Sequence, residues 1–237
     1  MADIEIQRGL WPDIPPVRAV PARIREVGRH CKGRLGLQPA HRDMPRFVSL
    51  VLASGSPSRL DVLRLLGLRF RVHPAEINED AIKASTPEAL VLELSRQKAT
   101  AVADEYSDAL VIGADSVICH EGNILGKPRD MNDAKRMLSC LSGATHEVIT
   151  GLTIVDRTRC AVSSREAKTR VTFRVLSEEA IERYAATGEP LGKAGAYALQ
   201  GTGALLVKRI DGEYSNVLGL PVATLVDLLD ELGYELL

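Results

Sequence analysis

The chain has 237 residues, of which 45% are hydrophobic and 26% charged, a length and composition that predict one folded unit with a substantial core. They exclude a fibre, a tandem array and a globally disordered protein. The 30 basic and 31 acidic residues leave a net charge of −1, which argues against duplex nucleic acid or an anionic membrane as a whole-molecule partner. Aromatic residues are scarce, at 4%, so a small-molecule site is favoured over a base-stacking platform.

Targeting and metal-binding patterns are weak in this chain. The N-terminus lacks the features of a signal peptide, and no apolar run approaches the roughly 20 residues of a membrane span, so we expect a cytoplasmic protein. The cysteines lie far apart, without C-x-x-C spacing or a matching histidine cluster, which leaves zinc unsupported and predicts reduced, buried thiols. They are Cys31, Cys119, Cys140 and Cys160.

Residues 1–46 differ in composition from the rest of the chain. They hold six of the twelve prolines, and nine Lys or Arg against five Asp or Glu, which predicts a loosely structured, basic extension. Such an arm could touch nucleic acid, although a solvated tail is the commoner outcome for scattered basic residues. Met44 lies just before the first predicted strand, so an alternative start codon would also explain the extension. We therefore divide the chain into 1–46 and a folded domain, 47–237.

From residue 47 the hydrophobic pattern alternates between strand and helix periods. Thr86 and Ser177 are typical N-cap residues, and Pro87 suits the first helical position. The predicted strands are 48–53, 68–73, 109–119, 146–156, 170–175 and 204–210, and the predicted helices are 59–66, 86–104, 130–141, 177–188 and 221–232. The pattern indicates a mixed α/β fold.

The loop Ser54-Gly-Ser-Pro-Ser-Arg59 is a candidate phosphate site. It lies between a buried strand and a helix, where backbone amides, hydroxyls, the helix dipole and a guanidinium can face one anion. It matches neither the P-loop nor the dinucleotide-binding pattern. An ordinary strand-to-helix turn with a capping serine explains the loop about as well.

Asp115 is a charged residue inside an apolar stretch. Gly113-Ala-Asp115 is expected to interrupt the strand, which would place the carboxylate at the end of a buried strand half, where it can activate water or hold a metal. The alternative is a turn-capping aspartate, but a buried charge needs a partner or a purpose. Lys98 on a helix and Lys127 after a hairpin turn are, each taken alone, expected at the surface.

Two further segments could contact a ligand. Residues 189–201 are rich in small residues around Lys193 and Gln200, which allows close backbone approach. The acidic loop 76–80 could ligate a hard cation, although a solvated carboxylate cluster is the commoner outcome. The residues alone thus favour a soluble α/β enzyme that acts on a phosphorylated small molecule.

Eight short motifs follow one another along the chain. They are 52–59 (LASGSPSR), 77–79 (INE), 96–99 (RQKA), 112–116 (IGADS), 125–129 (LGKPR), 141–143 (LSG), 189–197 (EPLGKAGAY) with Gln200-Gly, and 217–221 (VLGLP). In this order they resemble the Maf family of nucleoside triphosphate pyrophosphatases, from about residue 47 to the C-terminus.

The resemblance implies a fold, a reaction and a cofactor. The implied fold is a long, mixed, strongly twisted α/β sheet with flanking helices and two lobes around a central cleft, often in a homodimer, similar to inosine triphosphate pyrophosphatase. The implied reaction is hydrolysis of a nucleoside triphosphate to the monophosphate and pyrophosphate with a divalent cation, Mg²⁺ or Mn²⁺. The family is thought to clear non-standard nucleotides or to influence cell division.

The resemblance also implies roles for particular residues. Asp115 would be the catalytic proton acceptor that activates water, and Glu79, with Asp115 sharing, would hold the metal. The cations and hydroxyls would bind phosphate oxygens, as a phosphoryl-transfer site requires. The implied substrate-binding residues are Ser54, Ser58, Arg59, Lys98, Ser116, Lys127, Lys193 and Gln200.

The motifs of two branches of the family, compared with this sequence, indicate which nucleotides to expect as substrates. The dTTP/UTP branch typically has S-P-R-R in the first loop, G-A-D-T at the catalytic strand and a late Gln before Gly. Here Gln200 matches, Ser116 replaces the threonine and Ser58 replaces the first arginine, which removes a fork of donors. The Trp, Gln and Glu typical of the 7-methyl-GTP branch are absent. A pyrimidine-preferring or broad enzyme is favoured, and the alternatives are an enzyme for a modified purine or a non-catalytic nucleotide- or nucleic-acid-binding regulator of division.

Overall fold

The computed structural model describes residues 18–19 and 48–236, so the prediction of a loose extension falls almost wholly outside the described residues. In the described part the main sheet has seven strands in the order β3-β2-β4-β6-β7-β8, with β5 paired to the end of β4. Strand β2 is parallel to β3 and β4, and the other pairs are antiparallel. The strands are β2 (Ser49–Leu52), β3 (Phe70–Val72), β4 (Ala109–His120), β5 (Asn123–Leu125), β6 (Thr145–Asp156), β7 (Ala161–Phe173) and β8 (Val207–Asp211).

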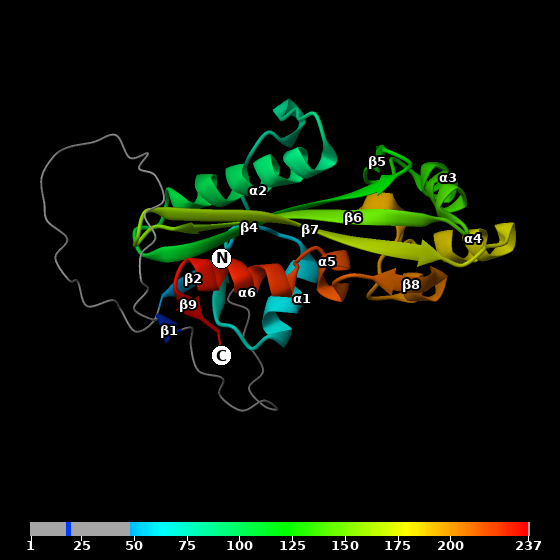
Figure 1. The fold of residues 1–237 in the computed structure, drawn as a ribbon. Helices are drawn as coiled ribbons and strands as arrows, with labels where there is room; N and C mark the ends of the chain where they lie inside the picture. The colour runs from blue at the N-terminus through cyan, green and yellow to red at the C-terminus, as the bar shows by residue number, and fades with distance from the viewer. Residues whose placement is uncertain (1–17, 20–47, 237) are drawn as a thin grey trace, which may run out of the picture.

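Helices flank this sheet on both faces, as Figure 1 shows. Helix α2 lies along one face of the long strands β4 and β6, and α6 lies on the other face, beside α1. Helices α3 and α4 pack together at the far end of the sheet, near β5 and β8. The helices are α1 (Pro57–Leu65), α2 (Pro87–Ala103), α3 (Met131–Leu141), α4 (Glu178–Ala185), α5 (Tyr214–Val217) and α6 (Val222–Glu231).

The predicted helix starts are confirmed by their capping bonds. The Thr86 hydroxyl accepts a hydrogen bond from the Ala89 amide at 3.1 Å, and the Ser177 hydroxyl accepts one from Ala180 at 3.2 Å. Each bond satisfies one of the four amides that an α-helix leaves free at its start. These ends follow from short-range chemistry, which explains why the sequence predicts them well.

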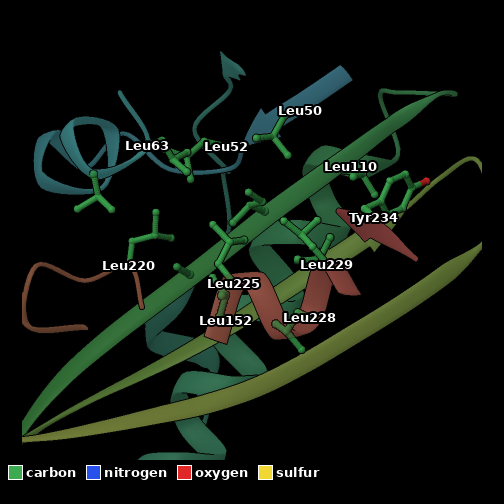
Figure 2. Close-up of a cluster of buried hydrophobic side chains, with 14 residues drawn as sticks. Leu50, Leu52, Leu63, Leu110, Leu152, Leu220, Leu225, Leu228, Leu229 and Tyr234 are labelled. Carbon is green, nitrogen blue, oxygen red and sulfur yellow. The ribbon is translucent and has the colours of Figure 1, made fainter. Parts of the chain in front are cut away.

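The hydrophobic core separates into clusters at the two ends of the long strands. The first cluster packs α6 and α1 against β2, β4 and β6, and Figure 2 shows it. It includes Leu50, Leu52, Leu63, Leu110, Leu152, Leu220, Leu225, Leu228, Leu229 and Tyr234. Each fully buried leucine of this kind contributes about 1.5–3 kcal/mol. A smaller cluster lies on the α2 side of the same lobe.

A second lobe forms around the other half of the same strands. Its core joins α3 and α4 to β6 and β7, with Leu138, Phe173, Tyr184 and Tyr197 among the buried residues. Strands β4, β6 and β7 run through both lobes. The expectation of a long mixed sheet with flanking helices is thereby confirmed, and the two separate cores leave room for a cleft between them.

Four features of the structure differ from the sequence expectations. Strand β4 runs unbroken through residues 113–115, because its antiparallel pairing with β6 continues across Gly113 and Asp115. Strand β7 begins at Ala161, nine residues before the predicted start, and short helix α5 was not predicted. The thiols of Cys140 and Cys160 are exposed and Cys119 is partly buried, so the expectation of buried cysteines is wrong for these residues.

The two ends of the described chain meet. Strand β1 (Arg18–Ala19) pairs antiparallel with β9 (Tyr234–Glu235). The Tyr234 hydroxyl donates a hydrogen bond to the buried Asp156 carboxylate at 2.8 Å, which fixes β9 to the end of β6. Among the residues that the structure describes, no helix combines the length and the apolarity needed to cross a membrane.

Candidate active site

A cavity of about 880 Å³ opens between the two lobes. All ten site residues expected from the sequence line it, from segments spread across most of the domain. They are Ser54, Ser58, Arg59, Glu79, Lys98, Asp115, Ser116, Lys127, Lys193 and Gln200. The volume falls in the range of small-molecule and cofactor sites.

The cavity exists because β4 lacks a strand partner along part of one edge. Strand β2 pairs with residues 109–112 of β4, and β5 pairs with residues 118–120. Between these two stretches, no strand in the described part of the chain pairs with residues 113–117 on that side, although β6 pairs with them on the other side. Asp115 lies at the middle of this unpaired stretch. The crevice where a sheet loses a strand neighbour is a common place for ligands in α/β folds.

Two glycines let α2 lie unusually close to the sheet. A Cβ atom at Gly113 would be 2.3 Å from the Ser95 carbonyl oxygen, and one at Gly151 would be 2.2 Å from the Val91 carbonyl oxygen. Both carbonyls belong to α2 and both glycines to neighbouring strands, β4 and β6. This glycine seam brings Lys98, which follows Ser95 by about one helical turn, within reach of Asp115.

Lys98 joins two carboxylates at the centre of the cavity. Its Nζ lies 2.6 Å from Asp115 Oδ1 and 2.8 Å from Glu79 Oε1. The side chains of Lys98 and Asp115 are 10% and 13% exposed, whereas that of Glu79 is 55% exposed. Sequence pattern alone placed Lys98 at the surface, but the glycine seam buries it against the sheet. The buried carboxylate thus has the cationic partner that its desolvation requires.

Arg59 forms the adjacent wall of the cavity. Its Nε donates to the Gly219 carbonyl at 2.8 Å, while its terminal nitrogens donate to the hydroxyls of Ser54 and Ser116, each at 3.1 Å. Burial lowers the pKa of the Arg59 guanidinium, and the nearby carboxylates of Asp115 and Glu79 oppose that shift. The group stays charged, since arginine does not lose its proton in proteins.

The first loop supplies hydroxyls and backbone to the same wall. Ser54 Oγ accepts a hydrogen bond from the Ser56 amide at 3.2 Å, and Ser58 lies in the first turn of α1. The Ser116 hydroxyl is within 2.9 Å of the Thr150 hydroxyl across the β4–β6 pair. Hydroxyls, a helix N-terminus and a guanidinium therefore converge as the sequence analysis expected.

The opposite wall comes from loops of the second lobe. Lys127 follows β5, and the Gly126 carbonyl accepts a hydrogen bond from the Gly195 amide at 3.0 Å, which ties the two loops together. Gly195 has φ of +65°, and a Cβ atom there would lie 2.6 Å from Ile118 Cδ1. The glycine therefore permits the close approach that places Lys193 on the cavity wall, as the small-residue pattern predicted.

The sequence analysis missed several residues of this cavity. Lys83 lines it near Glu79, and Tyr197 lines it beside Gln200, whereas Asp80, also on the wall, belongs to the acidic loop already named as a candidate. Lys83 lies in an irregular loop with no motif around it, so no pattern indicated a role. Tyr197 belongs to one of the eight motifs, but its partner His146, whose Nε2 lies 2.9 Å from the Tyr197 hydroxyl, is distant in sequence.

The donor set fits a hard divalent cation that also binds substrate. No group of three or more His, Cys, Asp or Glu side chains in residues 48–236 forms a complete metal site. Glu79 and Asp115 nevertheless present carboxylate oxygens to one point, the Lys98 ammonium. Mg²⁺ is commonly held by one or two carboxylates together with substrate phosphates and water, so two carboxylates beside a phosphate-binding wall are a suitable set.

Comparison with known proteins gives the family of the chain. The family model described as "Maf-like protein" matches residues 49–232. The chain belongs to the Maf family. A dTTP/UTP pyrophosphatase from Pelotomaculum thermopropionicum is 48% identical over 79% of this chain and 98% of its own. One from Moorella thermoacetica is 49% identical, over 78% and 96%.

A more distant relative and one solved structure complete the comparison. A dTTP/UTP pyrophosphatase from Bacillus anthracis is 44% identical over 78% of this chain and 96% of its own. The solved structure of protein VC0702 from Vibrio cholerae aligns with 57% of this chain and 68% of its own at 9% identity, with a TM-score of 0.28. That similarity is too low to support any inference about this Maf protein.

Proposed function

We propose that this protein hydrolyses nucleoside triphosphates between the α and β phosphates, giving the nucleoside monophosphate and pyrophosphate. The observation that carries the proposal is the buried Lys98 ammonium bridging Asp115 and Glu79 beside the Arg59 wall. A carboxylate base next to concentrated positive charge suits attack of water on a phosphorus atom whose oxygens carry negative charge. The Maf relatives at 44–49% identity, named dTTP/UTP pyrophosphatases, support this reaction.

Asp115 is the proposed proton acceptor. Its Oδ1 faces Lys98, which leaves Oδ2 as the oxygen that can take a proton from an attacking water. Lys98 stabilises the ionised carboxylate before the attack, and Arg59 with the Ser54 and Ser116 hydroxyls binds phosphate oxygens as charge builds on them. Lys127 and Lys193, on the opposite wall, would bind the departing pyrophosphate.

Glu79 and Asp115 are the residues that would hold Mg²⁺ or Mn²⁺. When bound, the cation would neutralise phosphate charge and orient the scissile group. The Lys98 ammonium now lies between the two carboxylates, so we infer that these side chains adjust when the metal and the nucleotide enter. Because Lys98 occupies the point that both carboxylates face, the protein's own residues form only part of a cation site.

Pyrimidine preference is the expected specificity. Gln200 lines the cavity with an amide that can donate to and accept from the edge of a base. Ser58, also on the cavity wall, offers a single hydroxyl where an arginine would offer five donors. We therefore expect dTTP and UTP to be substrates and the discrimination against other bases to be modest, consistent with a role in clearing non-standard nucleotides.

Oligomeric state and location are further expectations. We expect a homodimer in the cytoplasm, which light scattering of the purified protein and fractionation of cells would test. A monomer at micromolar concentration would contradict the first expectation. A nucleic-acid partner is not expected, and a salt-dependent gel shift with and without residues 1–46 tests that expectation directly, because phosphate-backbone binding weakens steeply with ionic strength.

The decisive test of the activity is pyrophosphate release from a panel of standard and modified triphosphates in Mg²⁺ and in Mn²⁺. Wild-type protein should release pyrophosphate, with dTTP and UTP among the best substrates, and Asp115→Asn should release it at least about 100-fold more slowly. Equal and negligible release by both proteins from every triphosphate would overturn the proposed function and favour a nucleotide-binding regulator.

A further inference from the structure

One uncharged stretch of the cavity wall is held by residues that do not line the cavity. Residues 197–200, which are Tyr, Ala, Leu and Gln, form this stretch. The walls that carry Arg59, Lys98 and Asp115 are charged, as the triphosphate requires. A neutral heterocycle is best matched by apolar surface and by amide groups. The segment 197–200 is therefore the part of the wall that suits the nucleobase.

The Glu189 carboxylate binds the backbone just after this segment. Its Oε2 accepts a hydrogen bond from the Thr202 amide at 2.9 Å, and its Oε1 accepts one from the Gly203 amide, also at 2.9 Å. Backbone hydrogen bonds to a carboxylate are charge-assisted and stronger than neutral ones. Burial raises the pKa of Glu189, but the hydrogen bonds from the Gly203 amide, the Tyr184 hydroxyl and the Thr202 amide outweigh it and hold that pKa below its ordinary value.

Tyr184 extends the same contact to the start of the segment. Its hydroxyl donates to Glu189 Oε1 at 3.0 Å and accepts a hydrogen bond from the Ala198 amide at 3.2 Å. Burial raises the pKa of Tyr184, so its hydroxyl keeps the proton that it donates. Glu189 and Tyr184 thus form hydrogen bonds with the backbone on both sides of Gln200, at residues 198, 202 and 203.

Two glycines make these hydrogen bonds to the backbone sterically possible. A Cβ atom at Gly201 would lie 2.5 Å from Glu189 Oε2, and one at Gly203 would lie 2.6 Å from the Tyr184 hydroxyl. The carboxylate and the phenol therefore reach the backbone only because the loop has no side chains at these two positions. The glycines next to Gln200 are explained by this contact, without any direct contact to a ligand.

The other end of the segment has its own anchor. The Tyr197 hydroxyl bonds to His146 Nε2, and the Tyr197 ring packs edge-on against Phe173, with ring centroids 4.9 Å apart. Tyr197 is buried in the second core cluster. With Tyr197 fixed from one side and residues 202–203 from the other, the backbone that carries Gln200 has little freedom.

We infer that Glu189, assisted by Tyr184, is a positioning residue that sets base selectivity by fixing the conformation of the Gln200 loop. It does so from behind the cavity wall, without touching the nucleotide. The inference deepens the proposed pyrophosphatase function and rests on it for the identity of the ligand. It separates base recognition from the chemistry at Asp115, because the Glu189 carboxylate bonds to Thr202, Gly203 and Tyr184, which do not line the cavity.

The test uses two variants that preserve size. Glu189→Gln keeps one acceptor oxygen but turns an NH₂ group toward a backbone amide, and Tyr184→Phe removes the hydroxyl link to Ala198. Glu178→Gln, on the exposed first turn of α4, is the matched control. Each full-length protein is assayed with dTTP, UTP, dCTP, GTP and inorganic tripolyphosphate, which has no base.

The expected result is a loss confined to substrates that have a base. For dTTP, Glu189→Gln should raise KM and lower kcat/KM by about tenfold or more, as misplaced contacts do. The dTTP:dCTP ratio of kcat/KM should move toward one, while hydrolysis of tripolyphosphate matches wild type. Tyr184→Phe should produce a smaller shift in the same direction. An equal loss on all substrates, or an unchanged dTTP:dCTP ratio, would overturn the inference.

A measurement without turnover separates this inference from the proposed reaction. Amide hydrogen exchange of residues 197–203 in nucleotide-free protein should be faster in both variants than in wild type and in Glu178→Gln, with no change in β4 or α2. Equilibrium binding of dTTP and dCTP should show the same loss of discrimination. If wild type released no pyrophosphate but these binding and exchange differences were found, the reaction would be refuted and the positioning role kept. Unchanged exchange and binding would refute the role itself.

Discussion

The cavity wall around Asp115 and Lys98 and the opposite wall around Lys127 and Lys193 are built from different kinds of element. On the first wall, Asp115 lies inside a twelve-residue strand and Lys98 inside a seventeen-residue helix, and the glycine seam presses the two elements together. On the second wall, Lys127 and Lys193 project from loops that are joined by the hydrogen bond between Gly195 and Gly126. The proposed base and its cationic partner are therefore on rigid elements, whereas the two substrate-binding lysines of the second wall are on loops.

The largest expected effect comes from the rigid wall. Asp115→Asn removes the proton acceptor and should lower kcat for dTTP by about 10²- to 10⁴-fold, the usual contribution of general-base catalysis. The folded structure should be largely kept, because the asparagine oxygen can still accept a hydrogen bond from Lys98. Pyrophosphate release and dTTP binding, measured on the same preparation, separate the two properties. A variant that turns over at the wild-type rate would assign the base elsewhere.

The glycine seam is the second target. Gly113→Ala would bring a Cβ atom into the Ser95 carbonyl, so α2 must shift away from β4 and carry Lys98 with it. We expect kcat to fall about 10²-fold, as for a displacement near 1 Å, and the free energy of unfolding to fall by about 1–3 kcal/mol. Urea unfolding and steady-state kinetics measure both.

Gly126→Ala provides the matched stability control, because no atom lies within 4 Å of the added methyl group. Its free energy of unfolding should equal that of wild type. If Gly113→Ala were equally stable and active, close approach of α2 would not be what positions Lys98.

The buried His146 of the second lobe should make the stability of the protein depend on pH. Burial lowers the pKa of His146 from 6.5 to about 4, with a smaller contribution from nearby His120. Between those pH values the unfolded chain binds a proton at this site and the folded protein does not, so stability rises with pH across that window. His146 should account for about 2–3 kcal/mol between pH 4 and pH 7.

The measurement compares urea unfolding of wild type and His146→Gln from pH 4 to pH 7. Carboxylates titrate in both proteins, so the difference between the two curves isolates the histidine. The variant should be less stable at pH 7, where it loses packing against Phe173, and the gap should narrow as the pH falls. Parallel curves would contradict a neutral, buried His146.

The smallest effects are expected on the loop wall. Lys127→Met removes an exposed cation and should raise KM for dTTP by about three- to tenfold with little change in kcat, because exposed charge contacts are weak. The increase should shrink as salt screens the wild-type contact. Lys208→Met, on the edge strand β8, is the control and should leave KM unchanged. A loss of kcat that matched Asp115→Asn would place Lys127 in the chemical step.

The parts of this structure that the sequence predicts are those decided by neighbours in the chain. Thr86 and Ser177 cap their helices through amides three residues away, and the motif around Asp115 carries its own apolar flanks. The ten expected site residues all line one cavity, because the resemblance to the Maf family supplied long-range information that periodicity alone does not contain.

The parts that the sequence did not predict depend on distant partners. Lys98 resembles any helical lysine until the glycine seam and Glu79 surround it. The first half of β7 is rich in polar residues such as Ser163 and Arg165. It becomes a strand because β6 pairs with it residue by residue along its length. Tertiary pairing in such cases overrides the local preference.

The hydrogen bond from Arg59 to the Gly219 carbonyl joins positions 160 residues apart. Contacts of such separation cost loop-closure entropy and slow folding. A chain leaving the ribosome can pair β6 with β7 soon after both are made, yet it cannot complete the Arg59 wall until the segment before α6 has emerged. A chain that stops short of Gly219 would therefore lack both the completed phosphate-binding wall and α6, whose leucines fill the first core cluster.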